Sequence, residues 1–150
     1  MKKLLAVSLF GFAIVFNSFS APASAEQLRS EVESAVKTKD TNAMLALIYW
    51  KDVSEKGKSI ETQEIGVMVT NDVVSVQLES WPADLPLEND YNGIHYKPNL
   101  KVIGMVNVKF ANKQGAVGSE MGYGQIDNTF LIAATIEEKS ATVSTNQMKN

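Results

Sequence analysis

The chain has no cysteine and a single histidine, His95. Without cysteine it can form no disulfide and carry no lipid-modified cysteine, and a zinc site made of His and Cys ligands is excluded. The acidic stretch at 88–93 lacks the ligand spacing of a calcium loop. We therefore predict no metal site and no cofactor, and expect the stability of the fold to come from an apolar core alone.

Long apolar runs are also missing, apart from one at the start of the chain. Two lysines precede the apolar residues 4–16, and the small-residue sequence Ala-Ser-Ala at 23–25 follows. The run is shorter than the roughly 20 residues that a membrane span needs. The pattern is typical of a secretory signal peptide over residues 1–25. We expect an exported protein, periplasmic or extracellular, whose mature chain starts at Glu26 and has no membrane span.

Basic runs are absent as well. Removal of the signal peptide leaves 12 basic and 17 acidic side chains, so that the formal net charge becomes −5. A mildly acidic chain without basic clusters lacks the electrostatic footprint of a nucleic-acid-binding protein. The glycines at 115–124 lack the Gly-Lys-Ser/Thr of a phosphate loop, and the sequence has no Gly-x-Ser-x-Gly nucleophile elbow.

The first half of the mature chain has helical patterns. Residues 26–38 carry apolar side chains at i, i+4 and i+8, which predicts a helix. A second helix is expected after an N-cap at Asp40 or the next residue, with an apolar face that continues to Trp50. A third is favoured over 54–70, although 60–70 also fits a strand.

From residue 73 onwards, β-branched and alternating patterns replace the helical ones. Asn92-Gly93 predicts a two-residue type I′ hairpin turn. Helices followed by consecutive strands indicate one α+β domain over 26–139, with N-terminal helices packed on a strongly curved antiparallel sheet. A polar, flexible tail is expected over 140–150. The longer expected strands are 73–80, 101–110, 117–124 and 129–137, with a loop at 81–90 and turns at 111–116 and 125–128.

Three segments resemble the nuclear-transport-factor-2-like superfamily, a cystatin-like α+β cone. Residues 35–50 (AVKTKDTNAMLALIYW) are similar to its first two helices, and 92–110 and 122–136 resemble its long hairpin strands. Asn128 stands where small secreted bacterial members of unknown function have glycine, and asparagine also accepts positive φ. The resemblance covers 27–138 and implies a pocket between the helices and the sheet.

Some members of that superfamily are isomerases or dehydratases that use Asp, His or Tyr in the pocket. The candidate catalytic residues here are His95, Asp52 and Tyr123. Asp40 is better explained as a helix cap, and Asp127 as a hairpin-turn residue. The candidate ligand-binding residues are the aromatic side chains Trp50, Trp81, Tyr91 and Tyr96.

His95 is the natural general base near neutral pH, but the sequence shows no partner for it. Alternation over 94–96 predicts that Ile94 and Tyr96 pack against the protein while His95 points to solvent.

Three functional hypotheses stay open. The first is an exported, non-catalytic domain that binds a small apolar ligand or a protein partner. The second is a structural module that forms a homodimer through an open apolar sheet face. The third is a pocket enzyme of isomerase, dehydratase or hydrolase type, which requires His95 or an aspartate inside the cavity and close to a tyrosine.

Overall fold

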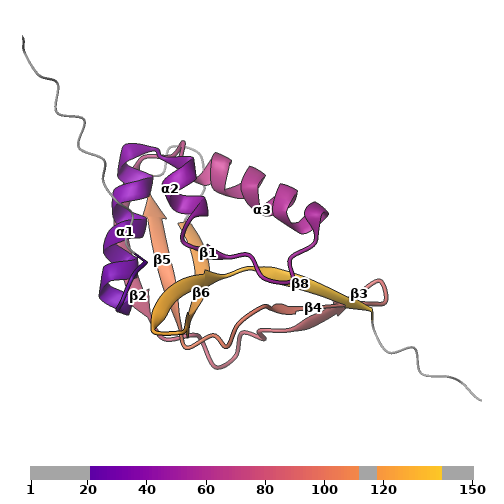
Figure 1. Ribbon diagram of the computed structural model, residues 1–150. Helices are drawn as coiled ribbons and strands as arrows, with labels where there is room; N and C mark the ends of the chain where they lie inside the picture. The colour runs from indigo at the N-terminus through magenta and orange to yellow at the C-terminus, as the bar shows by residue number, and fades with distance from the viewer. Residues whose placement is uncertain (1–20, 112–117, 140–150) are drawn as a thin grey trace, which may run out of the picture.

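The computed structural model describes residues 21–111 and 118–139, which form three helices and eight strands (Figure 1). The apolar run of the predicted signal peptide lies outside the described residues. So do the predicted tail over 140–150 and most of the turn predicted at 111–116. Within the described part of the chain, no helix is long and apolar enough to cross a membrane.

The helices come first along the chain and most of the strands follow. The helices are α1 (Ala25–Thr38), α2 (Thr41–Leu45) and α3 (Glu55–Met68). The strands are β1 (Ile48–Tyr49), β2 (Val73–Glu79), β3 (Asn89–Tyr91), β4 (Ile94–Pro98), β5 (Gly104–Phe110), β6 (Gly118–Ile126), β7 (Thr129–Ala133) and β8 (Thr135–Lys139).

The strands form two sheets. The larger has the order β1-β7-β6-β5-β2 and the smaller the order β3-β4-β8. Every pairing is antiparallel except that of β1 with β7. Because only Ala134 separates β7 from β8, one stretch of chain passes from the larger sheet into the smaller one (Figure 1). The predicted α+β class, with N-terminal helices on a curved, mostly antiparallel sheet, is confirmed.

Helix α1 packs on the inner face of the larger sheet. Its buried residues include Leu28, Val32 and Val36, at the predicted i, i+4 and i+8 positions. They share one apolar core with Val106 and Val108 of β5. Full burial of one such side chain contributes about 1.5–3 kcal/mol. The core therefore fixes α1 on the sheet without any disulfide.

Helix α1 begins at the boundary predicted for the signal peptide. Ser24 is its N-cap, and its Oγ accepts a hydrogen bond from the backbone N–H of Gln27 at 3.1 Å. Pro22 is buried, and its carbonyl accepts a hydrogen bond from the N–H of Phe130. Cleavage after Ala25 would remove this cap, and the loss of such a cap typically costs about 1 kcal/mol. The site of cleavage itself stays a prediction.

The second helix is shorter than predicted. Asp40 is its N-cap, as expected. Because α2 ends at Leu45, the prediction that its apolar face continues to Trp50 was wrong. Strand β1 follows instead and pairs with β7 beside Ile132. Its Ile-Tyr sequence suits a strand. The backbone N–H and C=O groups of β1, which would bond within the helix if α2 continued, bond to β7 instead.

The third helix ends close to the predicted position, and both predicted hairpin turns are present. Asn92 and Gly93 have φ of 52° and 75°, and Asp127 and Asn128 have φ of 46° and 64°. Positive φ at both central residues is what a type I′ turn requires.

Strand β3 begins at Asn89, inside the loop predicted at 81–90, and β6 continues to Ile126, inside the turn predicted at 125–128. Two other strands differ more from the prediction. The strand predicted over 129–137 is broken at Ala134, where the chain changes sheet. The strand predicted from residue 101 begins only at Gly104, because residues 99–103 connect the smaller sheet to the larger one. Alternation of side chains alone could not show either change, because both depend on the bend between the two sheets.

Candidate functional site

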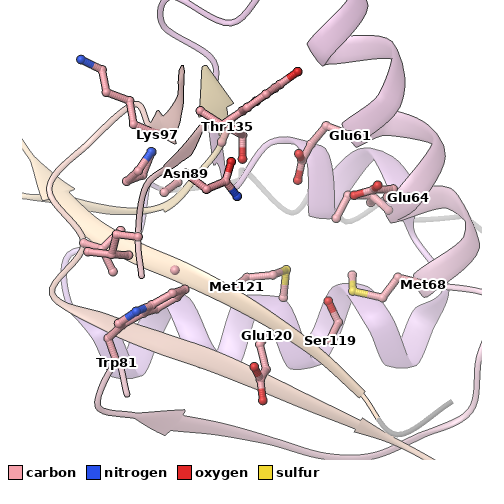
Figure 2. A pocket seen from close by; sticks show the side chains of 18 residues that line it. Glu61, Glu64, Met68, Trp81, Asn89, Lys97, Ser119, Glu120, Met121 and Thr135 are labelled. Atoms are coloured by element: carbon pink, nitrogen blue, oxygen red, sulfur yellow. The ribbon is translucent and has the colours of Figure 1, made fainter. Parts of the chain in front are cut away.

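A cavity of about 310 Å³ lies between α3 and the junction of the two sheets (Figure 2). Met68, Trp81 and Met121 supply much of its apolar wall, and Glu61 and Glu64 of α3 are among its polar groups. Such a volume is within the range of small-molecule sites, and the lining combines polar and apolar surface in comparable amounts.

An open strand edge forms part of the wall. Strand β6 pairs with β5 from Gly118 to Tyr123, but with β7 only from Tyr123 onwards. Among the described residues, 118–122 therefore pair on one side only, and Ser119–Gly122 line the cavity. An unpaired edge presents backbone N–H and C=O groups. The cavity therefore has backbone hydrogen-bonding groups beside its side chains.

Trp81 forms one end of the cavity and is held in place by two contacts. Its Nε1 donates a hydrogen bond to the carbonyl of Leu85 at 2.9 Å. Its ring lies against β6 at Gly122, where an added Cβ would be 3.3 Å from Cζ3 of the ring. Because its donor is already used, Trp81 offers the cavity an apolar ring surface in a defined position.

Glu61 and Glu64 lie at the other end of the cavity and point into it from α3 (Figure 2). Their i, i+3 spacing places them on one face of the helix. Within residues 21–111 and 118–139, no basic side chain forms an ion pair with either carboxylate. Burial and, to a smaller extent, the charge of Glu64 raise the pKa of Glu61. This end of the cavity is therefore negative, with Glu61 half-buried and Glu64 exposed to solvent.

Glu61→Gln is expected to raise the free energy of unfolding by about 0.5 kcal/mol at pH 7. Because the pKa of Glu61 is raised in the folded state, its proton stabilises the fold fully below the unfolded pKa of about 4.3. That contribution is lost as the pH rises through the folded pKa. Glutamine does not ionise, so the gain should be present at neutral pH and nearly absent at about pH 4, as measured by urea unfolding.

Glu55→Gln is the control for this prediction. Glu55 lies on the same helix, but its side chain is 91% exposed and pairs with Lys58 at 2.7 Å. It also lies in the first helical turn, where a negative charge is favourable. This substitution should therefore give no gain at pH 7. An equal gain for both variants, or a gain for Glu61→Gln that does not depend on pH, would contradict the prediction.

The predicted aromatic residues fall in three places. Trp81 and Tyr96 line the cavity. Tyr91 lies in the β3–β4 hairpin with 65% of its surface exposed. Trp50 lies in a separate shallow groove beside Lys58, and its Nε1 donates to a backbone carbonyl of α2.

The three candidate catalytic residues do not come together and do not line the cavity. Asp52 is exposed in a turn with φ of 63°. Tyr123 is buried in the core, and its ring centroid is 6.4 Å from that of Phe130. His95 lies in the small sheet, away from both.

His95 is half-buried, and its side chain contacts two exposed carboxylates at the surface of the smaller sheet. Its Nδ1 lies 3.1 Å from Oδ1 of Asp90, and its Nε2 lies 3.3 Å from Oε2 of Glu88. Ile94 and Tyr96 are half-buried as well. A three-stranded sheet covered only in part gives neither of its faces full burial, so the expected alternation is lost.

Sequence reasoning missed Glu61 and Glu64. They belong to a polar segment that has the pattern of a solvated helix face. The i, i+3 pair of glutamates was visible, but its meaning depends on which face of α3 lies over the sheets. Within the described residues, no group of three His, Cys, Asp or Glu side chains could hold a metal ion.

No protein-family model matches the sequence, and no curated protein matches it. Among solved structures, the chain is similar to a protein named Rd1NTF2_05 that carries five substitutions. The identity is 13%, the match covers 76% of this chain and 96% of that chain, and the TM-score is 0.39.

The chain is also similar to a nuclear transport factor 2 (NTF2-like) superfamily protein from Salmonella enterica serovar Typhimurium. That match has 9% identity, covers 84% of this chain and 100% of that chain, and has a TM-score of 0.28. Both TM-scores lie below 0.5, so neither match carries an argument about the family of this chain. These likenesses concern the overall fold alone, and the role of the site depends on the geometry of this chain.

Proposed function

We propose that this protein is an exported, non-catalytic domain that binds a small molecule in the cavity between α3 and the two sheets. The observation that carries the proposal is the cavity itself, with an apolar wall around Trp81 and Met121 and carboxylates at the opposite end. Export is inferred from the signal-peptide pattern of residues 1–25.

The positions of the candidate catalytic residues favour binding over catalysis. A pocket enzyme would need His95 or an aspartate within hydrogen-bond reach of a tyrosine in the cavity. Neither His95 nor Asp52 lines it, and Tyr123 belongs to the core. The carboxylates that point into the cavity, Glu61 and Glu64, are not among the predicted catalytic residues.

The outer face of the larger sheet gives less support to the homodimer hypothesis. Gln77, Asn107 and Glu120 are aligned across β2, β5 and β6, on the face opposite the buried Val76 and Val108. A row of polar side chains at the centre of this face is unlike the apolar core of a stable dimer interface. We therefore place the binding function in the cavity.

Trp81 provides a direct test. In a Trp50→Phe background, Trp81 is the only tryptophan, and its fluorescence should change when a ligand enters the cavity. We expect fragments with an aromatic or alkyl body to change this signal in a saturable way. Trp81→Ala should weaken their binding at least tenfold, as calorimetry with the otherwise native chain can measure.

The control is Trp50→Phe itself. Trp50 lies in a different groove, so this substitution should leave ligand affinity unchanged. If fragments bind with equal affinity after Trp81→Ala, or if no fragment at millimolar concentration changes the Trp81 signal, the proposal is wrong.

A further inference from the structure

The charges around the cavity point to the chemical class of its ligand. We propose, on the basis of the proposed function, that the ligand is a small organic cation. By this we mean a protonated amine joined to an apolar body. The amine would lie between Glu61 and Glu64, and the apolar body against Trp81 and Met121.

Four charged side chains belong to the cavity lining, but only two of them point into it. Glu61 and Glu64 point inward from α3, whereas Glu120 projects to the other side of β6 and Lys97 points away (Figure 2). Strand alternation agrees with this, because Glu120 must face opposite to its neighbour Met121. The charge that a ligand meets inside is therefore negative.

Lys97 does not neutralise the two glutamates. Its Nζ lies 2.7 Å from Oε1 of Glu138 on β8, so its charge is already paired outside the cavity. Within the described residues, neither Glu61 nor Glu64 has an ion-pair partner of its own. A cation with N–H donors would supply both the missing charge and charge-assisted hydrogen bonds.

The electrostatic state of Glu61 supports the same conclusion. Its pKa is raised, first by burial and then by the charge of Glu64. An ammonium group beside these carboxylates favours their ionised form and so reverses the second effect. A carboxylate ligand would be repelled by the same pair, and a neutral ligand would leave the half-buried Glu61 without an opposite charge.

The opposite end of the cavity requires an apolar body on the ligand. Trp81 has its Nε1 engaged with Leu85 and so presents ring surface, and Met121 lies between this ring and the glutamates in Figure 2. A bare metal ion would use the two inward carboxylates but not the apolar wall, and the described residues contain no metal-holding group of three His, Cys, Asp or Glu side chains. An organic cation uses both ends of the cavity.

The test compares three probes with one body and different head groups: phenylbutylamine, phenylbutanol and phenylbutanoate. At pH 7, each probe is titrated into the otherwise native chain by calorimetry and into the Trp50→Phe background, where Trp81 is the only tryptophan, by fluorescence. We expect the amine to bind about tenfold more tightly than the alcohol, and the carboxylate more weakly than both.

Matched variants show where the preference comes from. The double variant Glu61→Gln with Glu64→Gln should lose the tenfold preference for the amine and keep the affinity for the alcohol. Glu55→Gln removes one negative charge from the same helix outside the cavity and should change neither the preference for the amine nor the affinity for the alcohol. Circular dichroism and thermal melting confirm that each variant is folded before it is compared.

The outcomes separate this inference from the proposed function. If the alcohol or the carboxylate binds as tightly as the amine and still changes the Trp81 signal, the cavity binds small molecules but the cation inference is wrong. If the double variant keeps the full preference for the amine, the inference is also wrong. If none of the probes binds at millimolar concentration, both the inference and the proposed function are overturned.

Discussion

Asn99→Ala is expected to lower the free energy of unfolding by about 3 kcal/mol. The side-chain Nδ2 of Asn99 donates hydrogen bonds to the carbonyls of Tyr49 and Lys51, and its Oδ1 accepts one from the N–H of Ala134. Alanine would leave all three backbone groups without these partners. Each such hydrogen bond contributes about 1 kcal/mol. Because the site is partly buried, the losses of the three bonds should nearly add up.

The position of Asn99 explains why its loss should also reach the cavity. Its own backbone N–H donates to the carbonyl of Ala134 at 2.9 Å, so that side chain and backbone together hold the break between β7 and β8. Ala134 lines the cavity beside the open edge of β6. We therefore expect the variant to bind cavity ligands more weakly at temperatures where it is still folded.

Urea unfolding followed by circular dichroism measures the loss, and Asn107→Ala is the control. Asn107 lies on the outer sheet face and donates one hydrogen bond, to Glu79 at 3.1 Å. Its replacement should cost less than about 1 kcal/mol. Similar losses for the two variants would show that the three bonds of Asn99 add nothing beyond those of an ordinary surface asparagine.

Local signals in the sequence predicted the features that depend on neighbouring residues. Asp40 caps α2, and the Asn92-Gly93 pair forms its hairpin turn, because both use only local hydrogen bonds and backbone angles. The burial of Leu28 and Val36 also follows from a local helical period. The order of these elements was enough to predict the α+β class.

Features that depend on partners distant in the sequence were not predictable in this way. Strand β1 forms because Ile48 pairs with Ile132, 84 positions later in the chain. The local pattern of apolar residues cannot reveal such a distant pairing. The same holds for the break at Ala134, which is held by Asn99. Strand formation commonly depends on such context rather than on intrinsic preference.

The site was predictable only in part, for the same reason. Trp81 and Tyr96 were identified because large aromatic residues commonly line pockets. Glu61 and Glu64 were missed because an exposed glutamate on an amphipathic helix is the ordinary case. Their proposed role depends on the path of α3 over the junction of the sheets, where residues 99–103 also cross β6.

That crossing leads to the second large effect. Gly124→Ala is expected to lower the free energy of unfolding by about 3 kcal/mol or to prevent folding. A Cβ at position 124 would lie 2.2 Å from the carbonyl oxygen of Lys101 and 2.4 Å from Cδ1 of Leu100. The first of these contacts is with backbone, which cannot turn aside as a flexible side chain can.

The crossing segment cannot move away without breaking other contacts. Leu100 is buried, and the N–H of Ile103 donates to the carbonyl of Tyr123 at 2.9 Å, one residue before Gly124. At the start of the crossing segment, Asn99 forms two hydrogen bonds with the backbone of Ala134. Relief of the clash would therefore weaken the connection between the two sheets as well as the local packing.

Gly66→Ala separates this effect from the general consequence of replacing glycine. A Cβ at Gly66 meets no atom within 4 Å, and the residue lies inside α3, where alanine is favoured over glycine by about 0.5–1 kcal/mol. Urea unfolding should therefore show a gain for Gly66→Ala and a large loss for Gly124→Ala. A loss below about 1 kcal/mol at Gly124 would mean that the crossing segment is free to shift, and the rigid junction that we infer beneath the cavity would have to be abandoned.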